Sequence, residues 1–301
     1  MTIAVAPDPV RTRRTAALAL IGVTAVWGST FGLSKDLIAR LPVADYLGLR
    51  YLVGALVLLA VAPRLLRGLT RHTLTVGIGL GALYAAAQLL QFHGLARTAP
   101  TVSAFVVAMY VVFTALFSAF LPRHGVERIT WFAVVIATTG VAVMSLRGWA
   151  FGAGETMTLV AAALYAVHIL ALGRWSRPDE AFALTFLQLA TMGVVCTAIG
   201  ASDGLTLPGR SDLPAFAYLA VFAGTITLLV QTWAQGHIDS GRAAVLMVLE
   251  PVWAAVFAAL IWHESLGPRT LGGGTLILIA MLMVVSRPSA EPVPEPPTSH
   301  A

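Results

Sequence analysis

Ten long apolar runs dominate this sequence of 301 residues, and each is about the length of a helix that crosses a membrane. Hydrophobic residues make up 58% of the chain and charged residues only 11%, against roughly 25% charged residues in an average soluble domain. Only helices and closed barrels satisfy their backbone hydrogen bonds inside a bilayer, and the runs here are continuous, which excludes a barrel of alternating strands. The sequence therefore predicts an all-α polytopic membrane protein surrounded by the lipid bilayer. The ten expected transmembrane helices cover residues 16–34, 44–62, 73–95, 101–121, 129–146, 156–173, 181–200, 213–236, 242–262 and 269–286.

The chain also repeats itself. Residues 92–146 align with residues 232–286 at a constant shift of 140 without a gap, and a shift of 138 extends the match upstream. The match rests on hydropathy and on the positions of the polar residues that interrupt it. The two shifts pair Gln91 with Gln231, Tyr110 with Glu250, Trp27 with Tyr165, Thr30 with His168 and Arg50 with Gln188. A duplicated apolar chain is typical of many transporters.

The repeat divides the chain into four expected parts. A tail at 1–15 precedes a first repeat of five helices at 16–147, and a second repeat of five helices occupies 148–286. The residues at 287–301 are rich in Pro and Glu, and we expect them to form a disordered tail.

Positive charge predicts the orientation of these helices. With the N-terminus inside the cell, twelve of the nineteen Lys and Arg residues fall in cytoplasmic segments and six in outer loops. The nineteenth, Arg50, lies near the start of the second run, where we expect it to reach the interface or to pair with Asp45. The positive-inside rule then places both termini in the cytoplasm of a cell whose membrane the chain crosses repeatedly. Because each repeat has an odd number of helices, the second repeat is inverted relative to the first, which is the geometry of alternating access.

Polar and aromatic residues recur on one face of six expected helices, three from each repeat. In the helix at 73–95, for example, Tyr84, Gln88 and Gln91 follow Gly77 and Gly81 at spacings of three and four, which is one side of a helix. Each such residue could simply bond to a neighbouring helix. Glutamines on matched helices are costly to expose to lipid, however, so a shared polar cavity explains them together. The candidate substrate-binding residues are Trp27, Thr30, Tyr84, Gln88, Gln91, Tyr110, Tyr165, His168, Gln231, Gln235, Glu250 and Trp253.

Glu250 differs from the other candidates because it is acidic and lies near the centre of the ninth run. An ionised carboxylate at that depth costs on the order of several kcal/mol unless it is protonated, paired or hydrated. Pro251 follows it and removes an intrahelical hydrogen bond to Met247, which frees a carbonyl near the same depth. Glu250 is therefore the candidate for coupling transport to a proton gradient. The alternative is a neutral carboxyl group that only bonds another helix.

Four short motifs make the chain resemble the drug/metabolite transporter superfamily, in particular its ten-helix members with two EamA-type domains. The motifs are Trp27-Gly28-Ser29, Leu49-Arg50-Tyr51, Leu249-Glu250-Pro251-Val252 and Trp262-His263-Glu264-Ser265-Leu266. The first repeat departs from the family pattern, since Tyr110-Val111 replaces the Glu-Pro step and Pro122-Arg123-His124-Gly125-Val126 lacks an acidic residue. The resemblance implies ten helices around a cavity formed by helices one, three, four, six, eight and nine. It also implies secondary export (efflux) of small metabolites, amino acids or drugs.

Two other functions are alternatives to a secondary transporter. A passive facilitator or channel is the main alternative, and the sequence alone does not separate it from a carrier. An intramembrane enzyme is a remote alternative, because no nucleophile with a base, carboxylate pair or metal cluster is visible; His263-Glu264, for instance, lacks the second His of a zinc-binding helix. We therefore expect no catalytic residue, no metal, no cofactor and no nucleic-acid partner. The partner is a small-molecule substrate of unknown identity, and a homodimer is left open.

Overall fold

The structure is a computed structural model that describes residues 9–66, 69–118, 128–145, 152–201, 204–238 and 240–285. The described residues form helices and short connections and contain no strand. The helices in chain order are α1 (Pro9–Ile38), α2 (Val43–Val61), η1 (Pro63–Leu66), α3 (Arg71–Leu95), α4 (Pro100–Val107), α5 (Tyr110–Ser118), α6 (Arg128–Ser145), α7 (Ala153–Trp175), η2 (Pro178–Glu180), α8 (Ala181–Gly200), η4 (Arg210–Asp212), α9 (Leu213–Ala217), η5 (Tyr218–Ile226), α10 (Thr227–Gln235), α11 (Ser240–Leu246), η6 (Met247–Leu249), α12 (Glu250–Ile261) and α13 (Pro268–Val285).

Eight helical stretches among the described residues are long and apolar enough to cross a bilayer. They are Val10–Ile38, Val43–Val61, Arg71–Leu95, Pro100–Ser118, Ala153–Trp175, Pro178–Gly200, Arg210–Gln235 and Arg242–Ile261. The runs expected at 129–146 and 269–286 form α6 and α13, whose apolar segments, Trp131–Met144 and Pro268–Met283, are shorter. The protein is thus an all-helical polytopic membrane protein.

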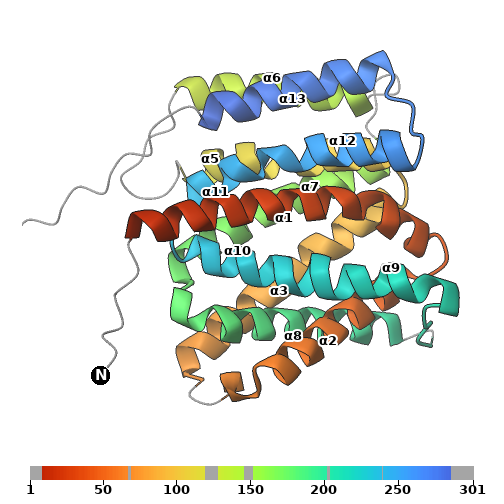
Figure 1. Cartoon of the computed structure of the whole chain (residues 1–301). Helices are drawn as coiled ribbons and strands as arrows, with labels where there is room; N and C mark the ends of the chain where they lie inside the picture. The colour runs from red at the N-terminus through yellow and green to blue at the C-terminus, as the bar shows by residue number, and fades with distance from the viewer. Residues whose placement is uncertain are drawn as a thin grey trace, which may run out of the picture.

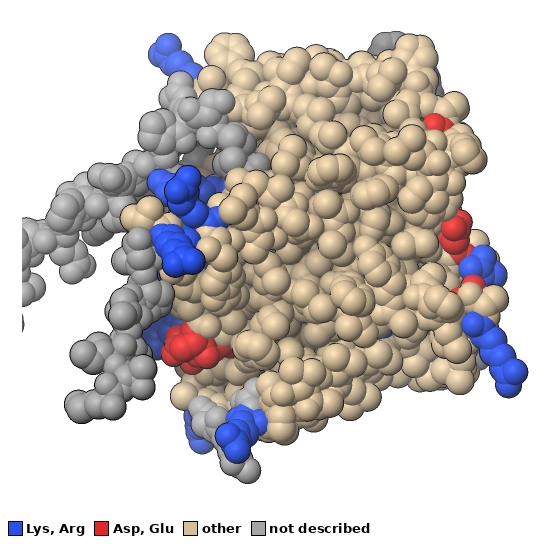
Figure 2. Space-filling view, in the orientation of Figure 1, with Lys and Arg blue, Asp and Glu red and all other residues tan. Residues whose placement is uncertain are grey.

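Charged side chains are confined to the two ends of the molecule in the view of Figure 2. A broad band that carries neither Lys, Arg, Asp nor Glu separates these ends. Both signs of charge occur at each end: several Lys and Arg side chains gather near an acidic patch at the end where α1 begins, and acidic and basic side chains lie together at the end where α1 finishes. An uncharged band between two charged rims is the surface expected of a protein embedded in a bilayer.

Helices from the two halves of the chain pack against each other in pairs (Figure 1). At one edge of the bundle α6 lies beside α13, and at the opposite edge α2 lies beside α8. Between these edges α1 packs on α10 and α12, while α7 packs on α3, α4 and α5. Small residues allow the closest approach: a Cβ atom added to Gly140 would lie 2.7 Å from the carbonyl oxygen of Gly273.

Two of the membrane-crossing stretches are interrupted near their middle. A turn at Ala108–Met109 separates α4 from α5, and the short 3₁₀-helix η6 separates α11 from α12. The shift of 140 seen in the sequence relates these two interruptions to each other. Pro251 accounts for the second interruption, because its nitrogen cannot donate to a carbonyl one turn earlier.

A third irregularity is the π-helix η5, which joins α9 to α10. Its wider turn shows in Thr225, whose hydroxyl donates to the carbonyl of Ala220, five residues earlier, at 2.9 Å. Single π-turns inside α-helices are rare and occur frequently at functional sites. The irregular segments α4–α5, η5 and η6 all contribute residues to the cavity described next.

Candidate functional site

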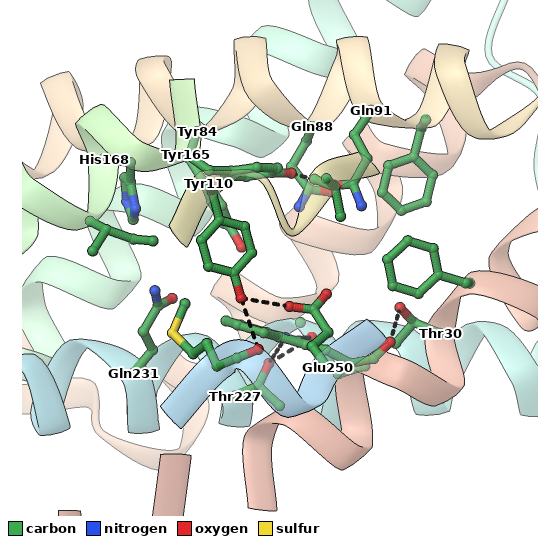
Figure 3. Close-up of a pocket in the computed structure, with 18 of the residues that line it drawn as sticks. Thr30, Tyr84, Gln88, Gln91, Tyr110, Tyr165, His168, Thr227, Gln231 and Glu250 are labelled. Carbon is green, nitrogen blue, oxygen red and sulfur yellow. Dashed lines mark hydrogen bonds between the residues drawn. The ribbon is translucent and has the colours of Figure 1, made fainter. Parts of the chain in front are cut away.

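A buried cavity lies between helices of both halves of the chain (Figure 3). The space not filled by protein atoms, its open mouth included, is about 670 Å³. In Figure 3, Gln88 and Gln91 enter it from one wall, and Thr30, Thr227, Gln231 and Glu250 lie at the opposite wall. The lining residues are Trp27, Thr30, Phe31, Arg50, Tyr51, Tyr84, Gln88, Gln91, Phe92, Val107, Tyr110, Tyr165, His168, Ile169, Ala223, Gly224, Thr227, Gln231, Met247 and Glu250.

Ten of the twelve residues that the sequence singled out line this cavity, and Gln235 and Trp253 do not. Gln235 is buried, but its amide donates to the carbonyl of Ile169 at 3.1 Å and so ties α10 to α7. Trp253 is 37% exposed, and its backbone and Cβ pack against Gly28 of α1.

Glu250 meets Tyr110 at the centre of the cavity wall. The Tyr110 hydroxyl lies 3.1 Å from Glu250 Oε2 and 3.2 Å from the carbonyl oxygen of Met247 (Figure 3). That carbonyl also accepts from the backbone N–H of Glu250, within the 3₁₀ turn that precedes Pro251. The Met247 carbonyl that Pro251 was expected to free is therefore not left without a donor, since it accepts from the N–H of Glu250 and lies within hydrogen-bond distance of Tyr110 from the other half of the chain.

Aromatic rings form a second part of the lining. Tyr84 stacks on His168 with 4.6 Å between the ring centroids and meets Tyr165 edge-on at 5.3 Å. The Tyr165 hydroxyl donates to Gln91 Oε1 at 2.5 Å. His168 Nε2 bonds Gln188 Oε1 at 2.8 Å, at the edge of the ring whose face stacks on Tyr84. These contacts fix α3 and α7 relative to each other and present flat ring faces to the cavity.

Polar groups without a protein partner also line the cavity. The Oε1 atoms of Gln88 and Gln231 are buried and accept no hydrogen bond from the described residues. Trp27 is satisfied by contrast, since its Nε1 donates to Thr227 Oγ1 at 2.9 Å. Buried acceptors without partners are uncommon in folded proteins, so Gln88 and Gln231 are groups that a ligand or water can satisfy.

Sequence reasoning missed the contribution of the second helix. Arg50 is only 4% exposed and lines the cavity together with Tyr51, so the expectation that it reaches the interface or pairs with Asp45 is wrong. Asp45 instead accepts the backbone N–H of Thr206 at 2.9 Å. The Leu49-Arg50-Tyr51 motif pointed to this position, but the place of Arg50 near the start of an apolar run suggested an arginine at the membrane interface. Phe31 and Phe92 were also missed, because apolar rings are ordinary in membrane helices.

Two glycines of α1 bring Trp27 and Thr30 close to Glu250. A Cβ atom on Gly28 would lie 2.5 Å from Trp253 Cβ, and one on Gly32 would lie 2.4 Å from the Trp262 ring. The helix can therefore lie directly on α12. The Trp27-Gly28-Ser29 motif is thus a packing motif as well as a source of cavity residues.

Polar contacts at the end of α1 connect it to two loops. The Lys35 ammonium donates to the carbonyl of Thr98, and Trp262 Nε1 donates to Asp36 at 2.9 Å. Glu264 Oε2 accepts the backbone N–H of Thr101 at 3.4 Å. The Trp262–Leu266 motif therefore joins the loop after α12 to the end of α1 and to the start of α4.

The described residues contain no group of three or more His, Cys, Asp or Glu side chains that could hold a metal ion. What the cavity offers is a carboxyl group, a guanidinium, amides, hydroxyls and aromatic rings. This set can bind and orient a small molecule through hydrogen bonds, charge and ring contacts.

The known proteins that this chain resembles in sequence are named as transporters or exporters. An uncharacterized transporter of Archaeoglobus fulgidus is 25% identical over 90% of this chain and 85% of its own length. The pseudopaline exporter CntI of Pseudomonas aeruginosa is 23% identical over 83% of this chain and 88% of its own. The uncharacterized inner membrane transporter YedA of Escherichia coli is 24% identical over 89% of this chain and 90% of its own length. A solved crystal structure has the same fold, with a TM-score of 0.66 at 18% identity over 91% of this chain and 97% of that one.

The model of the EamA-like transporter family matches the chain twice, over residues 14–146 and 152–286. Together the two matches cover nearly all of the described helices. The chain therefore belongs to the EamA-like transporter family, of the drug/metabolite transporter type, and is a multi-pass membrane protein.

Proposed function

We propose that the chain is a secondary transporter that exports small metabolites, such as amino acids or amphipathic drugs, by alternating access. The observation that carries this proposal is the buried polar cavity, lined by residues of both halves of the chain and supplied with unpartnered acceptors. Substrate sites of such transporters lie near the middle of the membrane between two repeats. The proposed substrate-binding residues are those of the twelve candidates that line the cavity.

The architecture we propose has ten transmembrane helices in two inverted repeats of five, at 16–147 and 148–286, with tails at 1–15 and 287–301. Matched packing supports it. The sequence shifts relate α1 to α7, α10 to α3 and α12 to α5. The contacts of α1 with α10 and α12 therefore correspond to those of α7 with α3 and α5. In this arrangement α6 and α13 count as the fifth and tenth transmembrane helices.

The orientation we propose places both termini in the cytoplasm of a cell whose plasma membrane holds the protein. The excess of Lys and Arg in the segments assigned to the cytoplasm supports it. The gathering of positive side chains where α1 begins agrees with the same orientation (Figure 2). A homodimer is not part of the proposal.

The coupling role we propose for Glu250 rests on its contacts. The Tyr110 hydroxyl has one proton but lies close to two acceptors, the Glu250 carboxyl and the Met247 carbonyl. When Glu250 is protonated, it can donate to the tyrosine oxygen, and the tyrosine can donate to Met247. When Glu250 is ionised, its carboxylate accepts the hydrogen bond of the tyrosine hydroxyl, and Met247 loses that donor. A proton on Glu250 therefore changes a contact between the two halves of the chain.

The relatives support transport and leave the cargo open. One relative is named a pseudopaline exporter and others are named only as transporters. Export by this chain is proposed by analogy with that exporter. An enzymatic role is not proposed, since nothing in the cavity matches a nucleophile with its base.

Counterflow in proteoliposomes tests the proposal against a passive facilitator or channel. Vesicles holding the purified chain are preloaded with one unlabelled amino acid or cationic drug, and uptake of the same labelled compound is measured. A carrier accelerates uptake when the compound is present on both sides, because the loaded protein returns faster than the empty one. Uptake that does not respond to preloading would indicate a channel, and no uptake of any compound would refute transport by this chain.

A further inference from the structure

A buried arginine without an acidic partner stands in the wall of the cavity. Arg50 is 4% exposed and lines the cavity directly. No Asp or Glu of the described residues lies within 4.0 Å of its nitrogen atoms. The salt bridge that the described residues form joins Arg40 to Asp212 and does not involve Arg50. A buried guanidinium without a counter-charge is unfavourable, so its presence here calls for an anion from outside the chain.

Neutral groups hold the Arg50 side chain in place. Its Nε donates to the carbonyl of Leu219 in the π-helix η5 at 2.9 Å, and its Nη1 donates to the Tyr46 hydroxyl at 3.0 Å. Three rings, those of Tyr46, Tyr51 and Phe92, lie 5.4 to 6.0 Å from its Cζ atom. Such cation–π contacts stabilise the positive charge without neutralising it. The guanidinium is therefore positioned in advance and keeps its full charge.

One side of the guanidinium remains open. Only two of its five N–H donors are used by described residues, and Nη2 has none of these bonds. Gly224, also in the cavity wall, faces the same group: a Cβ atom built on it would lie 3.4 Å from Nε and 3.9 Å from Nη2. A residue with a side chain would fill this space. A planar fork with free donors matches a carboxylate, which it can bind through two parallel hydrogen bonds.

Glu250 does not supply that carboxylate. It lines the same cavity but is not within 4.0 Å of Arg50, and its bonded partner is Tyr110. The cavity thus keeps a positive group and a carboxyl group apart. The unpartnered Oε1 atoms of Gln88 and Gln231 add acceptors that suit the donors of a bound molecule.

We propose that Arg50 is the anion-binding residue of the cavity and that the transported molecules carry a carboxylate, which the open side of the guanidinium binds. This inference rests on the proposed function and narrows it to one chemical class of substrate. A simpler role for Arg50 is to join α2 to η5 through Leu219. That role predicts that its removal weakens transport of every compound to the same extent.

Pairs of compounds that differ only in the carboxylate separate the two roles. The full chain in proteoliposomes is assayed by counterflow with L-leucine and L-phenylalanine, and with L-leucinamide and L-phenylalaninamide, which keep the amino group and side chain but lose the negative charge. We expect the acids to exchange about tenfold faster than the amides, since a hydrogen-bonded charge pair in a buried site discriminates at least that strongly. Arg50→Gln is expected to remove this preference by slowing the acids about tenfold and the amides less than about twofold.

Two controls cover the folding of the variant. Arg97→Gln removes an exposed arginine outside the cavity and should leave all four rates unchanged. Should Arg50→Gln not fold, thermal unfolding of the unaltered chain in detergent gives the same answer, because a ligand that binds the folded state raises the melting temperature. The acids should then stabilise the protein and the amides should not.

The outcomes distinguish this inference from the proposed function. Equal exchange of acids and amides by the unaltered chain, or an equal loss of both in Arg50→Gln, would overturn the anion site while leaving transport intact. Exchange of a cationic drug but of none of these four compounds would do the same. Exchange of no compound at all would overturn transport, and the anion site with it.

Discussion

Single residues decide the chemistry of the cavity, and Glu250 is the residue whose neighbours are most unusual. The groups with ionisable or basic side chains that line the same cavity are Arg50, Tyr51, Tyr84, Tyr110, Tyr165 and His168. Among the described residues only Tyr110 donates a hydrogen bond to its carboxyl group. A carboxyl with one neutral donor, inside a cavity that a solute can enter, can exchange a proton during a transport cycle.

Replacing Glu250 with Gln tests this role. The amide keeps the size of the side chain and still accepts from Tyr110, so folding and substrate exchange are expected to survive. It cannot take up or release a proton, so accumulation driven by a pH gradient is expected to disappear. Uptake into vesicles at several imposed pH gradients measures both properties. A Gln variant that responds to the gradient like the unaltered chain would leave Glu250 with a purely structural role.

The amides of the cavity give a second prediction at this scale. Gln88→Leu and Gln231→Leu are expected to reduce exchange about tenfold or more, because a bound molecule loses an acceptor, while insertion into the membrane is unaffected because Leu is cheaper than Gln in lipid. Gln235→Leu is the matched control. It lies outside the cavity and should keep its exchange rate, while losing about 1 kcal/mol of stability with its bond to Ile169.

Periodicity and charge allowed half of the residues that line the cavity to be predicted. Gln88, Gln91 and Gln231 stood out because polar groups at helical spacing are expensive in lipid. Arg50 could not be placed correctly, because the sequence shows how far a residue lies along a helix but not which neighbours surround it. Its environment is made by Tyr46, Phe92 and Leu219, and the last two come from other elements of the chain.

At the scale of elements, the fit between α1 and α12 sets the shape of the cavity wall. Gly28→Ala would place a methyl group 2.5 Å from Trp253 Cβ and 2.8 Å from the backbone nitrogen of Ala254. The backbone cannot yield as a flexible side chain can, so α1 is expected to move away from α12 at a cost of about 1–3 kcal/mol. Thermal unfolding of the purified variant in detergent should show a lower melting temperature, together with slower exchange.

Gly22 provides the comparison on the same helix. A Cβ atom there meets nothing within 4 Å, and Ala favours a helix by up to about 1 kcal/mol over Gly. Gly22→Ala is therefore expected to leave stability and exchange unchanged or slightly improved. A Gly28→Ala variant as stable and active as Gly22→Ala would show that the close approach of α1 to α12 is unnecessary.

Only part of this irregular structure could be predicted. Pro251 signals the interruption before α12 through its missing N–H. The matching turn at Ala108–Met109 has no Pro or Gly, and the single Gly224 of η5 does not by itself predict a π-helix. These irregularities depend on tertiary packing, which a single helical segment does not encode.

At the scale of the whole molecule, the proposed orientation can be tested with two single cysteines. Asp179 and Leu207 are exposed positions on either side of α8. In a chain without Cys196, a membrane-impermeant thiol reagent added to intact cells should label Leu207→Cys and not Asp179→Cys. Permeabilised cells should show both labelled, which proves that each site is reachable. Labelling of Asp179→Cys alone in intact cells would reverse the proposed topology.

Hydropathy predicted the class of fold and the approximate place of every long helix, because crossing lipid imposes a length and a composition that a sequence displays. It did not predict which helices touch. The pairing of α6 with α13 and of α2 with α8 joins segments more than a hundred residues apart, through small residues such as Gly140 and Gly273. Such pairings follow from shape, which hydropathy does not contain.

The bond between Tyr110 and Glu250 joins two positions that the shift of 140 makes equivalent. In an ancestor assembled from two identical subunits, the side chain at this position would have touched its own copy. Two glutamates would then repel each other, and two tyrosines would carry no charge at all. Joining both subunits in one gene removes this restriction, because each position can mutate alone. An acid with a neutral donor opposite it is a combination that two identical subunits cannot encode.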